Sequence, residues 1–285
     1  MALVWGSRTY VMGVINLTPD SFSDGGRFNA PERALAQARR LVAQGVHLLD
    51  LGAQSTRPGA ADIGAAEEQA RLLPALRLIL EGRAAGALPH PEGFTPLISI
   101  DTFRASVAAA ALEAGADWIN DVGGGRLDPP ILDVVAAAGC PYVLMHSRGD
   151  SRSMDELANY GAVGEEVLAE LRRGSEQALA AGIRREQLIW DPGLGFAKTT
   201  RHNLELLEAL PQLRAEGFPL LVGPSRKRFI GDVLAEPRPR ARLWGTATVA
   251  AKAIAGGADI LRAHDGGPIV QTARMADALW RISGG

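Results

Sequence analysis

The sequence predicts an α/β protein that folds as one TIM (β/α)8 barrel, a single domain over residues 1–285. Eight apolar runs that suit strands alternate with helical patterns, as in a series of βαβ units. The runs are apolar throughout, as expected for parallel strands covered on both faces. Helices also end in Ala-Gly or Gln-Gly directly before a strand, and such short links favour a compact barrel.

Each predicted strand ends on or near a polar residue. The strands are expected at 10–16, 46–52, 96–101, 118–122, 142–146, 188–193, 219–225 and 259–265. In a parallel barrel the carboxyl ends of all strands open at one mouth. Polar residues more than two hundred positions apart are therefore expected to face one substrate.

The helices are predicted from their start and stop signals. Residues 31–44 begin with Pro31, place Leu35 and Ala38 at helical spacing, and are followed by Gly45. Further helices are expected at 104–114, 129–138, 163–181, 201–215, 226–235, 241–255 and 268–282. The stretch 82–96 is loop-like and precedes the third strand, so it is expected at the opposite end from the mouth.

A doubly wound open sheet is the main alternative to the barrel. Such a sheet usually has a Gly-rich first turn with the pattern G-x-G-x-x-G. The first turn here, NLTPDSFSDGGRF at 16–28, is long and polar and lacks that pattern. The barrel is therefore favoured. The loop at 16–28 is either an ordinary surface connection or, because it is long and leaves the mouth, a lid.

Composition excludes several classes of partner. The net charge of −2 gives no basic field for nucleic acid or anionic membranes. No run approaches the ~18 apolar residues of a spanning helix, and the first ten residues lack the pattern of a secretory signal. Cys140 is the single cysteine, which predicts a cytoplasmic protein and a buried small side chain.

Acidic and amide residues end three of the strands. Asp101, Asn120 and Asp191 are expected to point into one small volume. Carboxylates gathered there would repel each other unless a ligand donor or a cation lay between them. A ring with several N–H donors, such as a 2-amino-4-oxopyrimidine, would satisfy them, and a divalent metal is the competing explanation.

Basic residues follow the last two strands. Ser225 precedes Arg226–Arg228 at a predicted helix start, where cations are unfavourable unless an anion or an electron-rich carbonyl binds. Arg262 and His264 alternate in the eighth strand, so both can face a phosphate at the mouth. A structural ion pair of Arg262 with Asp265 or a neighbour is the alternative.

Two further features carry polar groups. The loop after the second strand places Ser55 and Thr56 beside Arg57, an arrangement that suits an anionic group. His146 ends the fifth strand, and the sequence leaves open whether it is structural, a base or a ligand.

These motifs together resemble the dihydropteroate synthase family. The resemblance rests on an ordered set: MGVINLTPDSFSDGG, DLGAQSTRPGA, ISIDT, INDV, DPGLGFAKT, GPSRKRFIG and RAHD. It implies a TIM barrel that condenses 6-hydroxymethyl-7,8-dihydropterin diphosphate with 4-aminobenzoate, using Mg2+. It also implies a homodimer formed through helices away from the mouth, with small molecules as the other partners.

The resemblance assigns residues to three subsites. The pterin is expected to contact Asp101, Asn120, Asp191, Lys227 and Met145; the diphosphate Asn16, Thr56, Arg262 and His264; and 4-aminobenzoate Thr56, Arg57, Pro58, Phe196, Ser225 and Lys227. Asn16 is expected to act through Mg2+. Lys227, Arg262 and His264 are the expected catalytic residues.

The mechanism that follows is a dissociative displacement. Arg262, His264 and Mg2+ would stabilise the leaving diphosphate, and the arylamine needs placement more than activation. The chain departs from the family's usual residues at Ala53-Gln54, Ala197 and Arg228.

Two other functions compete. One is a corrinoid-dependent methyltransferase on a related barrel, which would not explain the phosphate residues. The other is a non-catalytic pterin-binding scaffold, which would be favoured if Lys227 and Arg262 were absent, whereas both are present.

Overall fold

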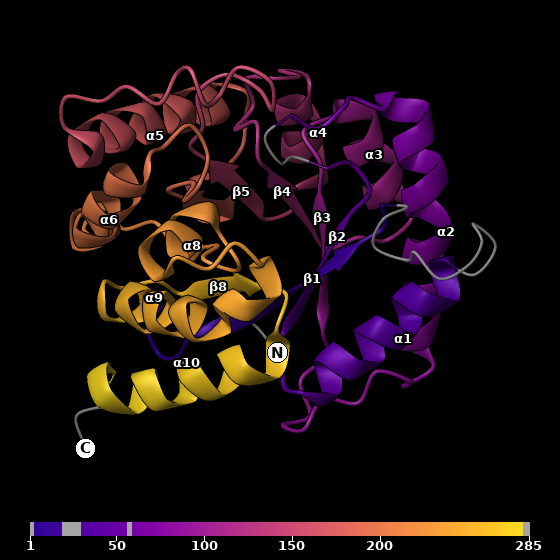
Figure 1. The fold of residues 1–285 in the computed structure, drawn as a ribbon. Helices are drawn as coiled ribbons and strands as arrows, with labels where there is room; N and C mark the ends of the chain where they lie inside the picture. Colours follow the sequence, from indigo (N-terminus) through magenta and orange to yellow (C-terminus); the bar gives the residue numbers. More distant parts are fainter. Residues whose placement is uncertain (1–2, 19–29, 56–58, 282–285) are drawn as a thin grey trace.

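A computed structural model describes residues 3–18, 30–55 and 59–281, and these form the predicted barrel (Figure 1). The strands are β1 Tyr10–Asn16, β2 Leu48–Gly52, β3 Leu97–Asp101, β4 Trp118–Asp121, β5 Tyr142–Met145, β6 Leu188–Asp191, β7 Leu221–Val222 and β8 Ile260–Ala263. They pair in parallel in the order β6-β5-β4-β3-β2-β1-β8-β7. A parallel bridge between Trp190 and Leu220 joins the two end strands. This closure confirms the barrel against the open doubly wound sheet.

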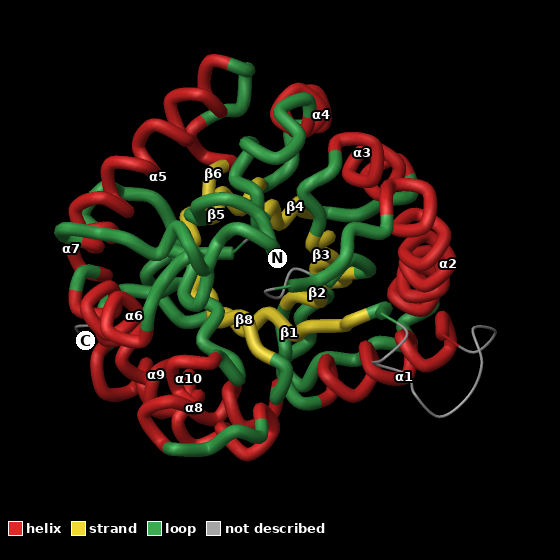
Figure 2. Tube along the Cα trace, turned by 45° about the horizontal axis from the view of Figure 1, so that its top comes forward, coloured by secondary structure: helices red, strands yellow, loops and turns green. Residues whose placement is uncertain are grey.

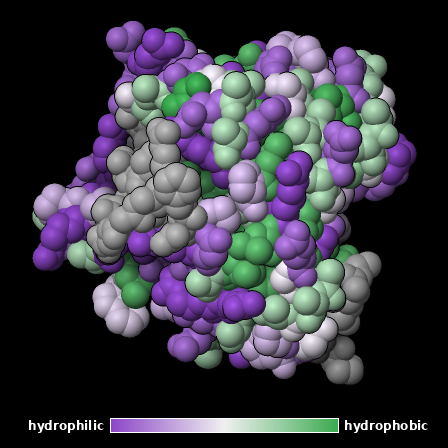
Figure 3. Space-filling view, turned by 90° about the vertical axis from the view of Figure 1, so that its right-hand side faces the viewer, coloured by the Kyte–Doolittle hydropathy of each residue, from purple (hydrophilic) through white to green (hydrophobic). Residues whose placement is uncertain are grey.

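The helices surround this ring of strands (Figure 2). They are α1 Ala30–Ala43, α2 Gly64–Ala84, α3 Ala105–Glu113, α4 Ile131–Ala138, α5 Val163–Ala180, α6 Thr200–Glu208, α7 Leu210–Arg214, α8 Arg228–Leu234, α9 Leu243–Ala255 and α10 Gly266–Trp280, with 3-10 turns η3 Arg185–Gln187 and η4 Pro239–Arg242. On the face that carries α1 and α2, hydrophilic residues are widespread and hydrophobic ones show between them (Figure 3). No helix in the described ranges is long and apolar enough to cross a membrane.

Two helical regions differ from the sequence prediction. A helix of 21 residues, α2, connects β2 to β3, where no helix was predicted. Pro74 lies inside it and usually signals a helix end, although Leu72, Leu76 and Ile79 form the buried stripe that could have revealed the helix. The predicted helix at 201–215 is divided into α6 and α7, because Pro211 begins a new turn.

The strands bury side chains on both of their faces. Outward-facing residues such as Val11, Leu49 and Leu261 pack against the helices in the larger apolar core. Inward-facing residues fill the amino end of the barrel, and this inner layer consists of Tyr10, Met12, Leu48, Trp118, Val143, Ile189, Leu221 and Ile260. Each such large apolar side chain contributes about 1.5–3 kcal/mol when fully buried. Because this layer occupies the amino end, a ligand can enter only at the carboxyl end.

Candidate active site

The inward-facing positions become polar two residues further along the strands. Strand side chains alternate, so a residue and the second one after it share a face. Leu48 is followed in this way by Asp50, Trp118 by Asn120, Ile189 by Asp191 and Ile260 by Arg262. Asp50, Asn120 and Asp191 are all buried. The fold thus gathers the polar strand ends inside the mouth of the barrel.

Arg262 lies at the centre of these polar groups. Its Nε donates to Asp50 Oδ2 at 2.6 Å, and its Nη2 donates to Asp101 Oδ2 at 2.6 Å. Asn120 Nδ2 donates to the same oxygen of Asp50 at 3.0 Å. One guanidinium therefore links β8 to β2 and β3 through charge-assisted hydrogen bonds. Arg262 and Asp101, which the resemblance assigned to different subsites, are in direct contact.

Burial perturbs the carboxyl groups of this cluster. Desolvation raises the pKa of Asp101; the attraction of Arg262 opposes the rise and the nearby Asp50 adds to it. Desolvation also raises the pKa of Asp191. Among the described residues, Oδ1 of Asp50 and Oδ1 of Asp101 are buried without a hydrogen-bond partner. Such oxygens can accept N–H groups of a ligand, and perturbed carboxyls that converge at one cavity mark a functional site.

A small cavity lies beside this cluster. It is lined by Asn120, Val122, Met145, Asp191, Leu194, Phe196, Gly223, Lys227 and Arg262. Its volume of about 20 Å³ holds roughly one water molecule. Lys227 Nζ lies 4.1 Å from the centre of the Phe196 ring, which is cation–π contact. A bicyclic ring can therefore enter only if side chains such as Lys227 or Phe196 move.

The turn after β6 fixes Asp191. Asp191 Oδ1 accepts a hydrogen bond from Gly193 N at 2.7 Å. Gly193 has φ of 70°, and a Cβ there would lie 1.9 Å from the carbonyl oxygen of His146, so only glycine fits. The DPGLG turn thus orients the carboxyl group of Asp191 at the end of β6.

The ends of β7 and β8 bring two predicted site residues, Ser225 and His264, into contact. Ser225 Oγ accepts from the backbone N–H of His264 at 3.1 Å and lies 3.0 Å from Nδ1 of that histidine. Arg226, rather than Arg262, pairs with Asp265, at 2.6 Å. The alternative of a structural ion pair of Arg262 is therefore wrong for Asp265, whereas its wider form holds, because Arg262 pairs with Asp50 and Asp101.

The first two loops lie partly outside the described residues. Thr56, Arg57 and Pro58 fall outside them, as does most of the loop at 16–28. Asn16 is half-buried at the end of β1, in register with Gly52. Gln54 crosses its loop, because Nε2 donates to the carbonyl oxygens of Ser55 and Ala61 and Oε1 accepts from Ile63 N. The neutral amide of Gln54 therefore ties the described parts of this loop together.

A larger cavity of about 260 Å³ adjoins the small one. Both are lined by Val122 and Phe196. The other residues around the larger cavity are Gln54, Ser55, Asp62, Phe103, Arg104, Leu127, Ser147, Gly149, Asp150, Ser151, Arg152 and Met154. The mouth therefore has room for a second small molecule beside the polar cluster.

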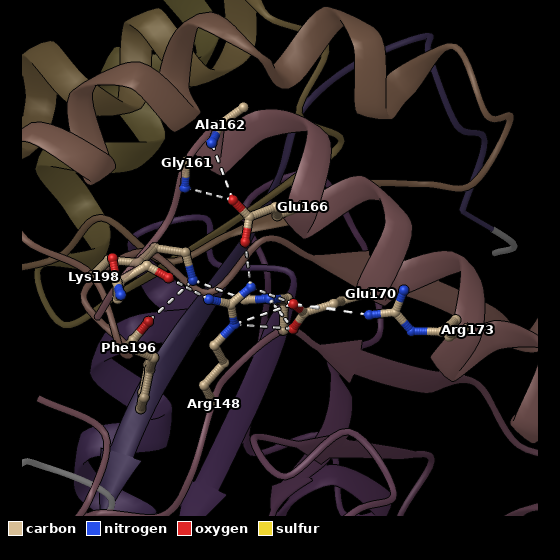
Figure 4. Close-up of polar contacts among 10 residues, drawn as sticks. Arg148, Gly161, Ala162, Glu166, Glu170, Arg173, Phe196 and Lys198 are labelled. Carbon is tan, nitrogen blue, oxygen red and sulfur yellow. Dashed lines mark hydrogen bonds and ion pairs between the residues drawn. The ribbon is translucent and has the colours of Figure 1, made fainter. Parts of the chain in front are cut away.

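His146 belongs to a buried polar network at the side of the mouth. Its Nε2 lies 2.9 Å from Glu170 Oε2, and its Nδ1 lies 2.9 Å from Lys198 Nζ. Arg148 forms ion pairs with both Glu170 and Glu166 (Figure 4). Burial and the charge of Lys198 lower the pKa of His146 to about 4, so the ring is neutral at pH 7. His146 is therefore placed as a neutral link between Glu170 and Lys198.

Sequence reasoning missed two residues of this region. Asp50 was noted as a strand-end residue, but its pairing with Arg262 across the barrel was not foreseen. Its position two residues after Leu48 was the available signal. Lys198 was noted only as part of a motif, and its burial was not foreseen. Among the described residues, no group of three or more His, Cys, Asp or Glu side chains is placed to hold a metal ion.

Comparisons with known proteins agree on one family. A family model described as pterin binding enzyme matches residues 12–264. The chain is 48% identical to a dihydropteroate synthase from Synechocystis over 97% of this chain and 92% of that protein. A dihydropteroate synthase structure from Clostridium difficile, determined with pteroic acid, has a TM-score of 0.89 at 36% identity, with 98% and 100% of the two chains covered. A Xanthomonas albilineans structure with 4-aminobenzoic acid has a TM-score of 0.88 at 38% identity, covering 98% and 95%.

Proposed function

The chain belongs to the dihydropteroate synthase family of pterin-binding enzymes, and we propose that it condenses 6-hydroxymethyl-7,8-dihydropterin diphosphate with 4-aminobenzoate to give 7,8-dihydropteroate and diphosphate. The observation that carries this proposal is the cluster of buried hydrogen-bond acceptors around Arg262, beside a cavity that opens to a larger one. Relatives have been solved with pteroic acid and with 4-aminobenzoic acid.

The pterin ring is the ligand that suits the polar groups around the small cavity, once Lys227 moves to make room for it. Asp101 Oδ1 is an unpartnered buried acceptor, and Asp191 and Asn120 line the cavity wall. Amino and ring N–H groups would donate to these oxygens, while Lys227 would donate to the ring carbonyl. Met145 supplies an apolar wall. Lys227 leaves Phe196 to make this contact, which opens space for the ring.

The diphosphate is proposed to lie where β1 and β8 end. His264 faces this region beside Ser225, and Arg262 supplies a permanent positive charge. Mg2+ usually binds one or two protein oxygens together with phosphate oxygens and water. The amide oxygen of Asn16 fits that need, whereas a cage made of protein side chains is not found among the described residues. Bound Mg2+ would neutralise charge on the leaving group.

The chemistry is proposed to be a dissociative displacement. The methylene C–O bond breaks and its electron pair leaves with the diphosphate, while the electron-rich ring supports the methylene cation. The amine lone pair of 4-aminobenzoate then forms the C–N bond, and the amine proton passes to solvent. Phe196 would hold the arylamine against the pterin, so that placement rather than a base drives this step. Thr56, Arg57, Pro58 and Ser225 stay part of the proposed aminobenzoate site, with Thr56 also at the diphosphate.

The two competing functions are less well supported. A corrinoid-dependent methyltransferase would use the pterin acceptors but has no need of Arg262 and His264 for a diphosphate. A non-catalytic scaffold gives no role to the cation of Lys227 in the cavity wall, whereas it would still need the ion pairs of Arg262 with Asp50 and Asp101.

The assay for this function combines the purified chain with the pterin diphosphate, 4-aminobenzoate and Mg2+. We expect dihydropteroate and diphosphate to form in equal amounts, and removal of Mg2+ by a chelator to lower the rate at least tenfold. The control replaces 4-aminobenzoate with benzoate, which lacks the nucleophilic amine. Diphosphate release without dihydropteroate, or no product at any pH between 6 and 9, would contradict the assignment.

We further propose that the protein is a cytoplasmic homodimer. Its outer helices expose large apolar side chains that a second copy could cover: Val233 and Leu234 on α8, Trp244 on α9, and Met275, Leu279 and Trp280 on α10. The single cysteine, Cys140, is buried and forms no disulfide, as suits the cytoplasm.

Sedimentation equilibrium tests the dimer. We expect a mass of about twice the 30.1 kDa of one chain, and Met275→Glu should shift the protein towards the monomer because it buries an unpaired charge. Leu204→Glu, at an exposed apolar site on α6, is the control. A monomeric wild-type protein at micromolar concentration would refute this part of the proposal.

A further inference from the structure

Lys198 is a buried lysine that the proposed reaction does not use. Its side chain is almost fully buried. Its Nζ lies 3.0 Å from the carbonyl oxygen of Phe196 (Figure 4). It also lies 3.1 Å from the carbonyl oxygen of Gly193 and 2.9 Å from His146 Nδ1. Burying a charge is costly unless hydrogen bonds compensate. The three hydrogen-bond partners around this one side chain therefore indicate that the fold compensates for its burial.

The two carbonyl groups belong to the turn that joins β6 to α6. This turn begins at Asp191, which lines the small cavity, and it contains Phe196, which lines both cavities. Its backbone includes Ala197 in the left-handed region with φ of 47°, where a residue other than glycine is strained. An unusual backbone of this kind persists only if its surroundings hold it in place.

The network behind Lys198 connects this turn to α5. In its charged form Lys198 only donates, so Nδ1 of the neutral His146 accepts and Nε2–H of His146 donates to Glu170. Arg148 holds Glu170 from the other side. Burial lowers the pKa of Lys198 to about 7, against the opposing attraction of Asp191, and both the ammonium and the amine can donate to the two carbonyls.

We propose that Lys198 is a positioning residue for the reaction: by holding the carbonyls of Gly193 and Phe196, and being held by His146, it fixes the Phe196 ring between the two cavities. Asp191 depends less on Lys198, because it lies in β6 and has its own hydrogen bond from Gly193 N. Loss of Lys198 therefore releases Phe196 more than it disturbs the pterin acceptors.

This inference rests on the proposed function, since it names the second substrate as the one that Phe196 places. The test uses Lys198→Met, which keeps the length of the side chain and removes its donors. We expect the KM for 4-aminobenzoate to rise about tenfold, as for loss of a charged hydrogen bond. The Kd for 6-hydroxymethylpterin, measured by calorimetry without turnover, should change less than about threefold. Lys252→Met, on the exposed face of α9, is the matched control.

A pair of variants at His146 provides a second test if Lys198→Met does not fold. His146→Asn keeps an oxygen acceptor for Lys198 and should retain the wild-type KM for 4-aminobenzoate. His146→Leu removes that acceptor and should raise this KM. An unchanged KM in Lys198→Met, or equal KM values in the two His146 variants, would overturn the proposal. Absence of product from the wild-type enzyme would instead refute the proposed function.

Discussion

Replacing Arg262 by Met is expected to abolish dihydropteroate formation and to lower the free energy of unfolding by about 3–5 kcal/mol, the cost of removing one partner of a buried ion pair. Arg262 forms charge-assisted hydrogen bonds to both Asp50 and Asp101. Without it, two carboxyl groups lie buried in the barrel with no cation. The same change removes the fixed positive charge proposed to stabilise the leaving diphosphate.

A double-mutant cycle separates the two effects. Asp50→Asn combined with Arg262→Met removes one of the stranded charges, so it should recover part of the lost stability while activity stays absent. Urea denaturation measures the stability, and single-turnover kinetics measures the activity. Arg201→Met, at an exposed ion pair on α6, is the control and should change unfolding by less than ~1 kcal/mol. A stable and active Arg262→Met protein would contradict the role of Arg262 in both respects.

Replacing Asp191 by Asn is expected to raise the Kd for 6-hydroxymethylpterin by about 30- to 100-fold. The carboxyl group is buried beside the small cavity and accepts from Gly193 N. An amide brings two N–H donors to a place where the ligand and the backbone both donate, so at least one donor is left unsatisfied, at about 1–3 kcal/mol.

Calorimetric titration with the pterin that lacks the diphosphate isolates this effect. Asp133→Asn on the exposed side of α4 serves as the control, because it makes the same change at an exposed residue that lines neither cavity. Asp191→Asn should still bind diphosphate normally, since that site is proposed at β1 and β8. An unchanged pterin Kd would show that Asp191 does not contact the ring.

The barrel could be predicted because its strands carry a repeated local signal. Each apolar run indicates by itself that its strand is buried. The change from Leu48 to Asp50, or from Ile189 to Asp191, indicates where the packed interior of the barrel ends and its mouth begins. These signals lie within one strand and need no knowledge of its neighbours. By contrast, α2 was not predicted, because Pro74 is a helix-breaking signal inside it. The apolar residues at helical spacing, Leu72, Leu76 and Ile79, were nevertheless present in the sequence.

The contacts across the mouth could not be predicted in the same way. Asp50 and Arg262 are 212 positions apart, and only the closed ring determines that one guanidinium reaches both Asp50 and Asp101. Lys198 was likewise noted in the sequence only as part of a motif, but the turn buries it against three acceptors. Sequence identified the polar strand ends; which of them pair with each other depends on the register and curvature of the barrel.

A crystal structure with 6-hydroxymethylpterin and 4-aminobenzoate, grown with diphosphate and Mg2+, tests the central claim most directly. The account predicts the pterin in the barrel mouth with its N–H groups on Asp101, Asn120 and Asp191, the Phe196 ring against the aminobenzoate, and the diphosphate near Arg262 and His264. A pterin bound elsewhere, or turned so that its N–H groups face away from these three residues, would contradict it.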